Sequence, residues 1–111
     1  MVDQKPMQVA ELFFGRSIAG REPLSEAEWM QFSATTLSAE FPDGFTVVDG
    51  KGQWRDPASG RTLAEDTKIV IAAGGIGPAF ARHVAAAADT YKKAYRQQSV
   101  GILVHDACGA F

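Results

Sequence analysis

The segment between residues 45 and 73 constrains the fold most, because two strand-like arms of equal length flank one strong turn. Residues 45–56 and residues 62–73 are both rich in β-branched or aromatic side chains, and residues 57–61, which contain Pro57 and Gly60, separate them. Apolar runs of this kind, bounded by proline and glycine, are typical of strands joined in a hairpin. The sequence therefore predicts one long antiparallel hairpin.

A glycine-containing stretch inside the first arm allows two interpretations. Residues 49–50 are Asp-Gly, which suits a tight type I′ turn and would divide the arm into a shorter hairpin. Alternatively, the glycines form a bulge in one continuous strand. We favour the bulge because it keeps the two arms equal in length. In that register Gln53 faces Glu65 and Trp54 faces Ala64.

Two helical patterns and two more strands surround the hairpin. A capping box of Ser25 and Glu28 predicts a helix that runs to about residue 40. Pro78 suits the first turn of a second helix. Strands are predicted at residues 9–15 and 99–111. The resulting order is β-α-β-β-α-β, so we predict an α+β, ferredoxin-like sandwich with a long central hairpin, formed by residues 1–111 as a single domain.

The first strand places apolar side chains on both of its faces. Alternation puts Leu12 and Phe14 on one face, and Val9 and Phe13 with Glu11 on the other. In a ferredoxin-like fold both helices cover one face of the sheet, so the second apolar face needs another cover. Exposed apolar patches mark interfaces. We therefore predict a homo-oligomer, with a dimer favoured, built through sheet faces or exchanged hairpin arms.

Composition excludes several classes of protein. The net charge is −2 and charges are scattered evenly, which argues against a nucleic-acid-binding surface. No apolar segment approaches the length that spans a bilayer, and the first residues lack the apolar stretch of a signal peptide. We expect a cytoplasmic protein that binds neither nucleic acid nor membrane. The single Cys108 and two distant histidines offer no metal-ligand spacing, so we expect no metal. We also expect no organic cofactor.

Acid/base chemistry is the kind of catalysis that the remaining residues can support. Glu11, Glu65, His105 and Asp106 are candidate proton carriers, of which Glu11 and His105 are favoured as catalytic residues. Arg55 is the candidate anchor for a carboxylate or enolate, because its planar fork donates two hydrogen bonds. We predict that substrate contacts come from Trp54, Tyr91, Gln53 and Glu65. The alternative is structural: Arg55 forms an ion pair, Trp54 plugs the hairpin end, and Tyr91 packs in the core.

Several segments together resemble a bacterial family of unknown function, the domain-of-unknown-function family numbered 3574. The resemblance covers nearly the whole chain, and its most specific element is Gly52-Gln53-Trp54-Arg55. The other matching segments are residues 11–15, 25–29, 41–44, 91–92 and 98–100. The resemblance supports the fold boundaries and implies no activity. The predicted shape is also similar to small oligomeric ferredoxin-like enzymes such as muconolactone isomerases and cofactor-free monooxygenases, an analogy of fold alone.

Three functional hypotheses follow. The first is a small-molecule enzyme without metal or organic cofactor, an isomerase or lyase that moves a proton on a small carbonyl or carboxylate compound. The second is a non-catalytic oligomeric module that binds a small ligand. The third is a purely structural assembly protein, which would have no enclosed pocket.

Overall fold

The computed structural model describes residues 3–111, and its elements follow the predicted order. The strands are β1 Lys5–Gly15, β2 Thr46–Arg55, β3 Thr62–Gly74 and β4 Gly101–Gly109. The first helical segment consists of α1 Glu26–Phe32, a π-helical stretch η1 Ser33–Leu37, and α2 Ser38–Glu40; the second is α3 Pro78–Tyr95. The predicted α+β fold, with its β-α-β-β-α-β order, is confirmed.

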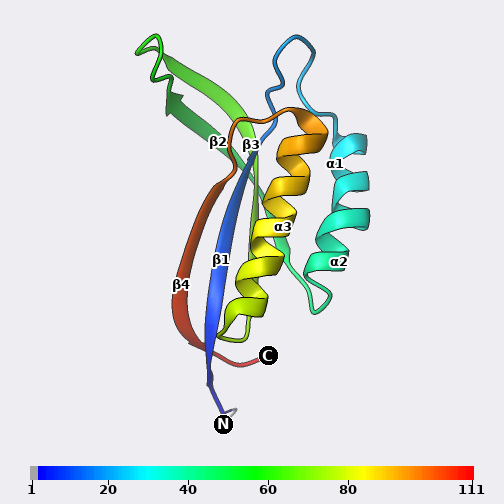
Figure 1. The fold of residues 1–111 in the computed structure, drawn as a ribbon, viewed down its shortest axis with the longest axis vertical. Helices are drawn as coiled ribbons and strands as arrows, with labels where there is room; N and C mark the ends of the chain where they lie inside the picture. Colours follow the sequence, from blue (N-terminus) through cyan, green and yellow to red (C-terminus); the bar gives the residue numbers. More distant parts are fainter. Residues whose placement is uncertain (1–2) are drawn as a thin grey trace.

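The four strands form one antiparallel sheet in the order β2-β3-β1-β4. Both helical segments lie against the same face of this sheet (Figure 1). The β2–β3 hairpin continues past the end of the helices, which makes the molecule elongated, with extents of 50 × 29 × 24 Å. The long hairpin therefore presents an end that the helical layer of its own chain does not cover.

The register of the hairpin corrects the predicted bulge. Pairing is unbroken from Thr46 opposite Ile71 to Arg55 opposite Thr62, so Gln53 faces Ala64 and Trp54 faces Leu63. The glycines of β2 do not add an unpaired residue to the strand. They leave space for neighbouring side chains. A Cβ on Gly50 would lie 3.0 Å from Ile69 Cδ1, and a Cβ on Gly52 would lie 3.0 Å from Trp54 Nε1.

The core lies between the sheet and the helices, around an aromatic cluster. Phe14 is fully buried, and its ring centroid lies 4.8 Å from that of Tyr91 and 5.5 Å from those of Trp29 and Phe32. An apolar stripe on α3 supplies the other wall through Phe80, Val84, Ala87, Ala88 and Tyr91, all of them buried. The capping box that starts α1 is also present, with Ser25 and Glu28 each bonding the other's backbone N–H.

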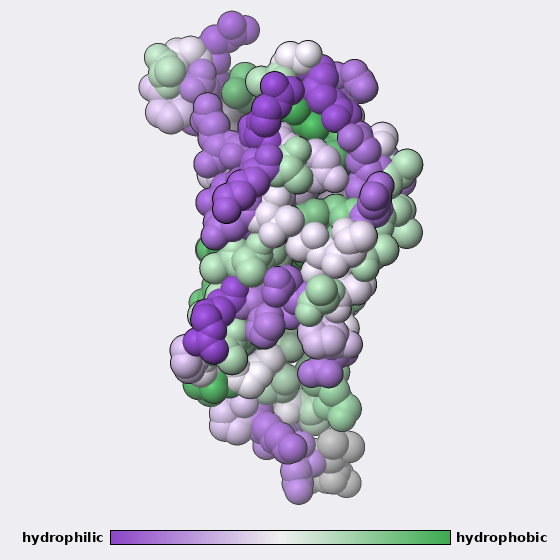
Figure 2. Space-filling view, turned by 45° about the vertical axis from the view of Figure 1, so that its right-hand side comes forward, coloured by the Kyte–Doolittle hydropathy of each residue, from purple (hydrophilic) through white to green (hydrophobic). Residues whose placement is uncertain are grey.

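The far face of the sheet is apolar and partly exposed, as the alternation of the first strand predicts. On β1, Val9, Glu11 and Phe13 point away from the helices and are half-buried, whereas Leu12 and Phe14 are fully buried. The neighbouring strands extend this face with Val48, Ile71 and Leu103, which are 45%, 38% and 58% exposed. We call it the open face. The helix side differs, since Figure 2 shows hydrophilic and weakly hydrophobic side chains mixed there. Among residues 3–111, no helix is long and apolar enough to cross a membrane.

Candidate functional site

Two of the predicted catalytic residues lie together on the open face. His105 of β4 pairs with Val9, and Glu11 pairs with Leu103, so Glu11 and His105 are diagonal neighbours on adjacent strands. Such diagonal pairs place Cβ atoms about 7–8 Å apart or somewhat less, within reach of long side chains. Both side chains point away from the helices, because Glu11 and Val9 alternate with the buried Ala10. The open face therefore carries an acid and an imidazole side by side.

The surroundings of Glu11 are apolar. Its direct partners across the two ladders are Ile71 and Leu103, and along its own strand the same face carries Val9 and Phe13. Glu11 itself is half-buried, and within residues 3–111 no hydrogen bond or ion pair holds its carboxylate. An acid in this setting is free to act on a bound ligand. Asp106, the acid of β4, points to the helix side, where Gln8 Nε2 donates to it over 3.4 Å.

The predicted anion anchor lies far from this pair within one chain. Arg55 is opposite Thr62, whereas Glu11 is opposite Ile71, and these two positions are nine residues apart along β3. At the rise of a strand this separation is roughly 30 Å. The alternation also places Arg55 on the helix-facing side of the sheet. A single chain therefore does not bring Arg55 to Glu11.

The other residues predicted to contact a substrate are divided between the hairpin end and the core. Trp54 is 44% exposed and lies on the same side of the sheet as Glu11, and its indole folds back over Gly52; Gln53 is exposed on the opposite side. Glu65 accepts a hydrogen bond from the Ser17 backbone N–H over 3.1 Å. These side chains occupy the end of the molecule where the hairpin projects.

Tyr91 lies in the core instead of lining a pocket. It is fully buried, and its hydroxyl donates a 2.7 Å hydrogen bond to the Gly15 carbonyl. Burial raises the pKa of Tyr91 far above its usual range. This arrangement matches the packing alternative raised for Tyr91, so we leave it out of the candidate site.

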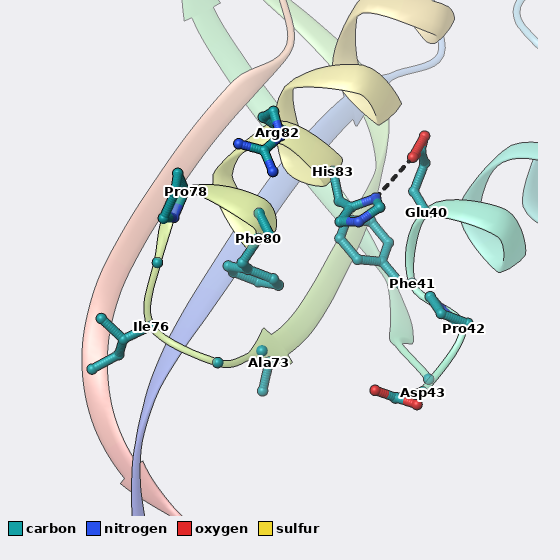
Figure 3. A pocket seen from close by; sticks show the side chains of 15 residues that line it. Glu40, Phe41, Pro42, Asp43, Ala73, Ile76, Pro78, Phe80, Arg82 and His83 are labelled. Carbon is teal, nitrogen blue, oxygen red and sulfur yellow. Dashed lines mark hydrogen bonds and ion pairs between the residues drawn. The ribbon is translucent and has the colours of Figure 1, made fainter.

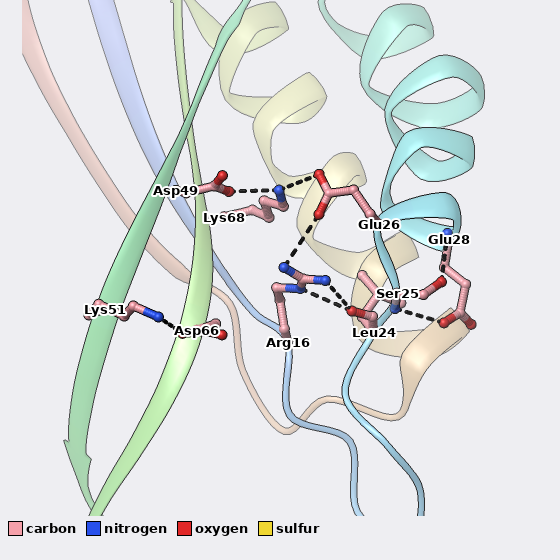
Figure 4. Close-up of polar contacts among 9 residues, drawn as sticks. All are labelled: Arg16, Leu24, Ser25, Glu26, Glu28, Asp49, Lys51, Asp66 and Lys68. Carbon is pink, nitrogen blue, oxygen red and sulfur yellow. Dashed lines mark hydrogen bonds and ion pairs between the residues drawn. The ribbon is translucent and has the colours of Figure 1, made fainter.

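A buried lysine that sequence reasoning missed holds the first helix to the sheet. Lys68 is 3% exposed, and its ammonium lies 2.6 Å from Asp49 and 2.7 Å from Glu26 (Figure 4). Burial alone would lower the pKa of Lys68, but the hydrogen bonds that its ammonium donates to the two carboxylates outweigh this effect, and the net shift is upward. Arg16 adds to the cluster with hydrogen bonds to the Leu24 carbonyl. The sequence held one signal for this buried site, namely a lysine inside the apolar run of the predicted strand at residues 62–73.

Sequence reasoning also missed a second polar site. It borders a hollow at the end of the molecule opposite the hairpin tip. The hollow has a volume of about 430 Å³ and lies between residues 40–44, residues 73–77 and the first turns of α3. At its edge His83 Nδ1 lies 3.1 Å from Glu40 Oε1 (Figure 3). No local sequence pattern predicts this pair, because 43 residues separate His83 from Glu40. Within the described residues, no group of three histidine, cysteine or acidic side chains is arranged to hold a metal ion.

Comparisons with known proteins identify a family and a shared fold. A family model described as "Protein of unknown function (DUF3574)" matches residues 9–111. A search of curated proteins finds no match. Among solved structures, a phage SAM lyase in complex with S-methyl-5′-thioadenosine is 17% identical, with a TM-score of 0.71 over 95% of this chain and 90% of that one. The same comparison with a phage SAM lyase in the apo state gives 18% identity and a TM-score of 0.67, over 89% and 79%.

A different protein extends the likeness. CutA from Synechococcus elongatus is 9% identical, with a TM-score of 0.58 over 96% of this chain and 83% of that one. At identities this low, the structural similarity establishes the ferredoxin-like fold alone. The chemistry of each protein depends on its own residues.

Proposed function

The chain belongs to the DUF3574 family, whose function is unknown, and we propose that it is a small-molecule lyase or isomerase that works by proton transfer. Its substrate is a small carbonyl or carboxylate compound, and neither a metal nor an organic cofactor takes part. One member of the Glu11–His105 pair removes a proton beside the carbonyl. The other returns a proton, to a second carbon in an isomerase or to the leaving group in a lyase.

The observation that carries the proposal is the position of Glu11 and His105 on one apolar face. Their strands are hydrogen-bonded neighbours, and Ile71 and Leu103 flank the carboxylate directly. Positioned general acids and bases contribute about 100- to 10,000-fold to a rate, and they act best where water is excluded. The Glu11–His105 pair supplies a positioned acid and base, and a cover over the apolar surface would exclude water from them.

A second copy of the chain is the proposed cover. The open face is apolar and partly exposed, as an interface within a homo-oligomer would be. The hairpin end, which carries Gln53, Trp54 and Arg55, projects beyond the helices of its own chain. In a dimer this end is available to reach the partner's open face. Arg55 would then anchor the substrate's carboxylate or enolate beside the partner's acid/base pair.

The fold relatives support the lyase branch of the proposal. The lyase with the TM-score of 0.71 acts on SAM, and its structure holds S-methyl-5′-thioadenosine. S-adenosylmethionine carries a carboxylate, so it falls within the proposed substrate class. It is therefore the first compound to test, followed by small keto acids and lactones.

The test is product formation followed by proton NMR with the purified full-length chain. Glu11→Gln and His105→Ala should each lower turnover about 100-fold or more, and Arg55→Ala should raise the KM. Asp106→Asn is the matched control, because Asp106 is adjacent to His105 in sequence but points to the helix side. Turnover that is unchanged in both Glu11→Gln and His105→Ala would refute the site.

A second candidate is a non-catalytic oligomeric module that binds a small ligand. The separation of Arg55 from Glu11 favours it, since within residues 3–111 of one chain the proposed anchor does not meet the proposed acid/base pair. This function predicts that a ligand raises the melting temperature while its NMR spectrum shows no conversion.

A further inference from the structure

A hollow lies at the end of the molecule opposite the hairpin tip, and neither Glu11 nor His105 lines it. The turn after α2 forms one wall, and the loop between β3 and α3 forms another. Phe41 and Phe80 are buried beneath it, with ring centroids 6.2 Å apart. Figure 3 shows the His83 ring next to Phe41, with Phe80 further along the same hollow. Aromatic rings therefore form an apolar base under a polar edge.

Glu40 selects the tautomer of a neutral imidazole at that edge. The Glu40 carboxylate lies 3.1 Å from His83 Nδ1, and a carboxylate accepts but does not donate hydrogen bonds. In neutral His83 the proton is therefore on Nδ1, and Nε2 carries a free lone pair. Among residues 3–111, no protein group bonds that Nε2. The imidazole side chain is half exposed, so a ligand can reach it.

The charges around the hollow select among ligands. Glu40 and Asp43 carry two negative charges, and Arg82 carries one positive charge, so with neutral His83 the wall has a net charge of −1. The Asp43 side chain points in the direction of Ala73, near the end of β3 (Figure 3). The hollow thus offers two hydrogen-bond acceptors, His83 Nε2 and the Asp43 carboxylate, above an aromatic base.

We propose that this hollow binds a flat ring compound that carries N–H donors and is cationic or neutral. The ring packs against Phe41 and Phe80, and its donors bond to His83 Nε2 and to Asp43. Aromatic contacts of this kind favour rings over aliphatic chains of equal size. The two acceptors favour amidine and amine groups over carboxylates, because an anion would meet like charge. This site is distinct from the acid/base pair of the proposed function.

The test uses three probes of matched shape and different charge: benzamidine, benzamide and benzoate. Titration of the full-length, ¹⁵N-labelled chain at neutral pH is followed by the amide signals of Gly44, Gly75 and Gly77, which border the hollow. The Trp54 indole N–H signal, on the distant hairpin, is the internal control. We expect benzamidine to shift the three glycine signals and bind more tightly than benzamide, with benzoate weakest.

Variants separate this site from mere surface binding. Asp43→Asn should weaken benzamidine binding roughly tenfold or more, the usual worth of a hydrogen bond to a charged group. Glu40→Gln should weaken it as well, because the hollow then loses one of its two negative charges. Asp89→Asn, which removes an equivalent charge on the exposed side of α3, should leave binding unchanged, and so should Glu11→Gln.

Three results would overturn the proposal: benzoate binding as tightly as benzamidine, absence of shifts at the glycine signals at saturating probe, or equal affinity in Asp43→Asn and Asp89→Asn. A melting curve for each variant establishes that it is folded. Glu40 and Asp43 are not core residues, so loss of binding in a folded variant reports on the site itself.

Discussion

Replacement of Tyr91 by phenylalanine isolates one buried hydrogen bond and decides between two roles for this residue. The hydroxyl is fully buried and donates to the Gly15 carbonyl over 2.7 Å, at the end of the central strand β1. Phenylalanine retains the ring and its contacts with Phe14 and Phe32. The substitution therefore removes the donor and leaves the aromatic packing intact.

The expected loss follows from the burial of both partners. A buried acceptor left without its donor costs about 1–3 kcal/mol. The entropy of unfolding is about 2.1 cal/mol/K per residue, so each kcal/mol lowers the melting temperature of a chain of this length by roughly 4 °C. Tyr91→Phe should therefore lower the melting temperature by about 4–13 °C.

The measurement is thermal unfolding by calorimetry, with Tyr95→Phe as the control. Tyr95 is half-buried, its ring also packs on Phe32, and the structure describes no hydrogen bond from its hydroxyl. It should change the melting temperature by no more than a degree or two. If Tyr91→Phe unfolds at the wild-type temperature, or if it alters ligand affinity while stability is unchanged, the structural role assigned to this hydroxyl is wrong.

Two further predictions concern packing and pH. A Cβ on Gly74 would overlap Phe80 Cδ1, so Gly74→Ala should destabilise the protein by about 1–3 kcal/mol in urea unfolding, whereas Gly75→Ala, with no atom within 4 Å, should not. Hydrogen bonds from the Arg21 guanidinium lower the pKa of Glu28 from 4.5 to about 2, so this carboxylate stabilises the fold fully above about pH 4.5 and the benefit disappears as the pH falls toward 2. The difference in melting temperature between wild type and Glu28→Gln should be largest at neutral pH and vanish near pH 2. A difference that stays constant with pH would show that the ionised Glu28 carboxylate does not stabilise the fold.

Local signals in the sequence were enough to predict the elements and their order. The Ser25–Glu28 capping box, the proline at the start of α3 and the apolar stripe of that helix act within a few residues, so the chain encodes them without reference to its fold. Alternation along β1 likewise separated the buried face, with Leu12 and Phe14, from the open face. The order of these elements predicted the ferredoxin-like arrangement.

Only the tertiary structure decided which distant residues meet. The glycines of β2 read as a bulge, but they accommodate Ile69 and Trp54 across and along the strands, a packing fact with no local signature. The pairing of Glu40 with His83 and the burial of Lys68 between two acids join residues more than 15 positions apart. Strand register fixes such meetings, and register depends on how side chains from the whole chain fill the core. The same register placed Glu11 beside His105 and kept Arg55 away from both.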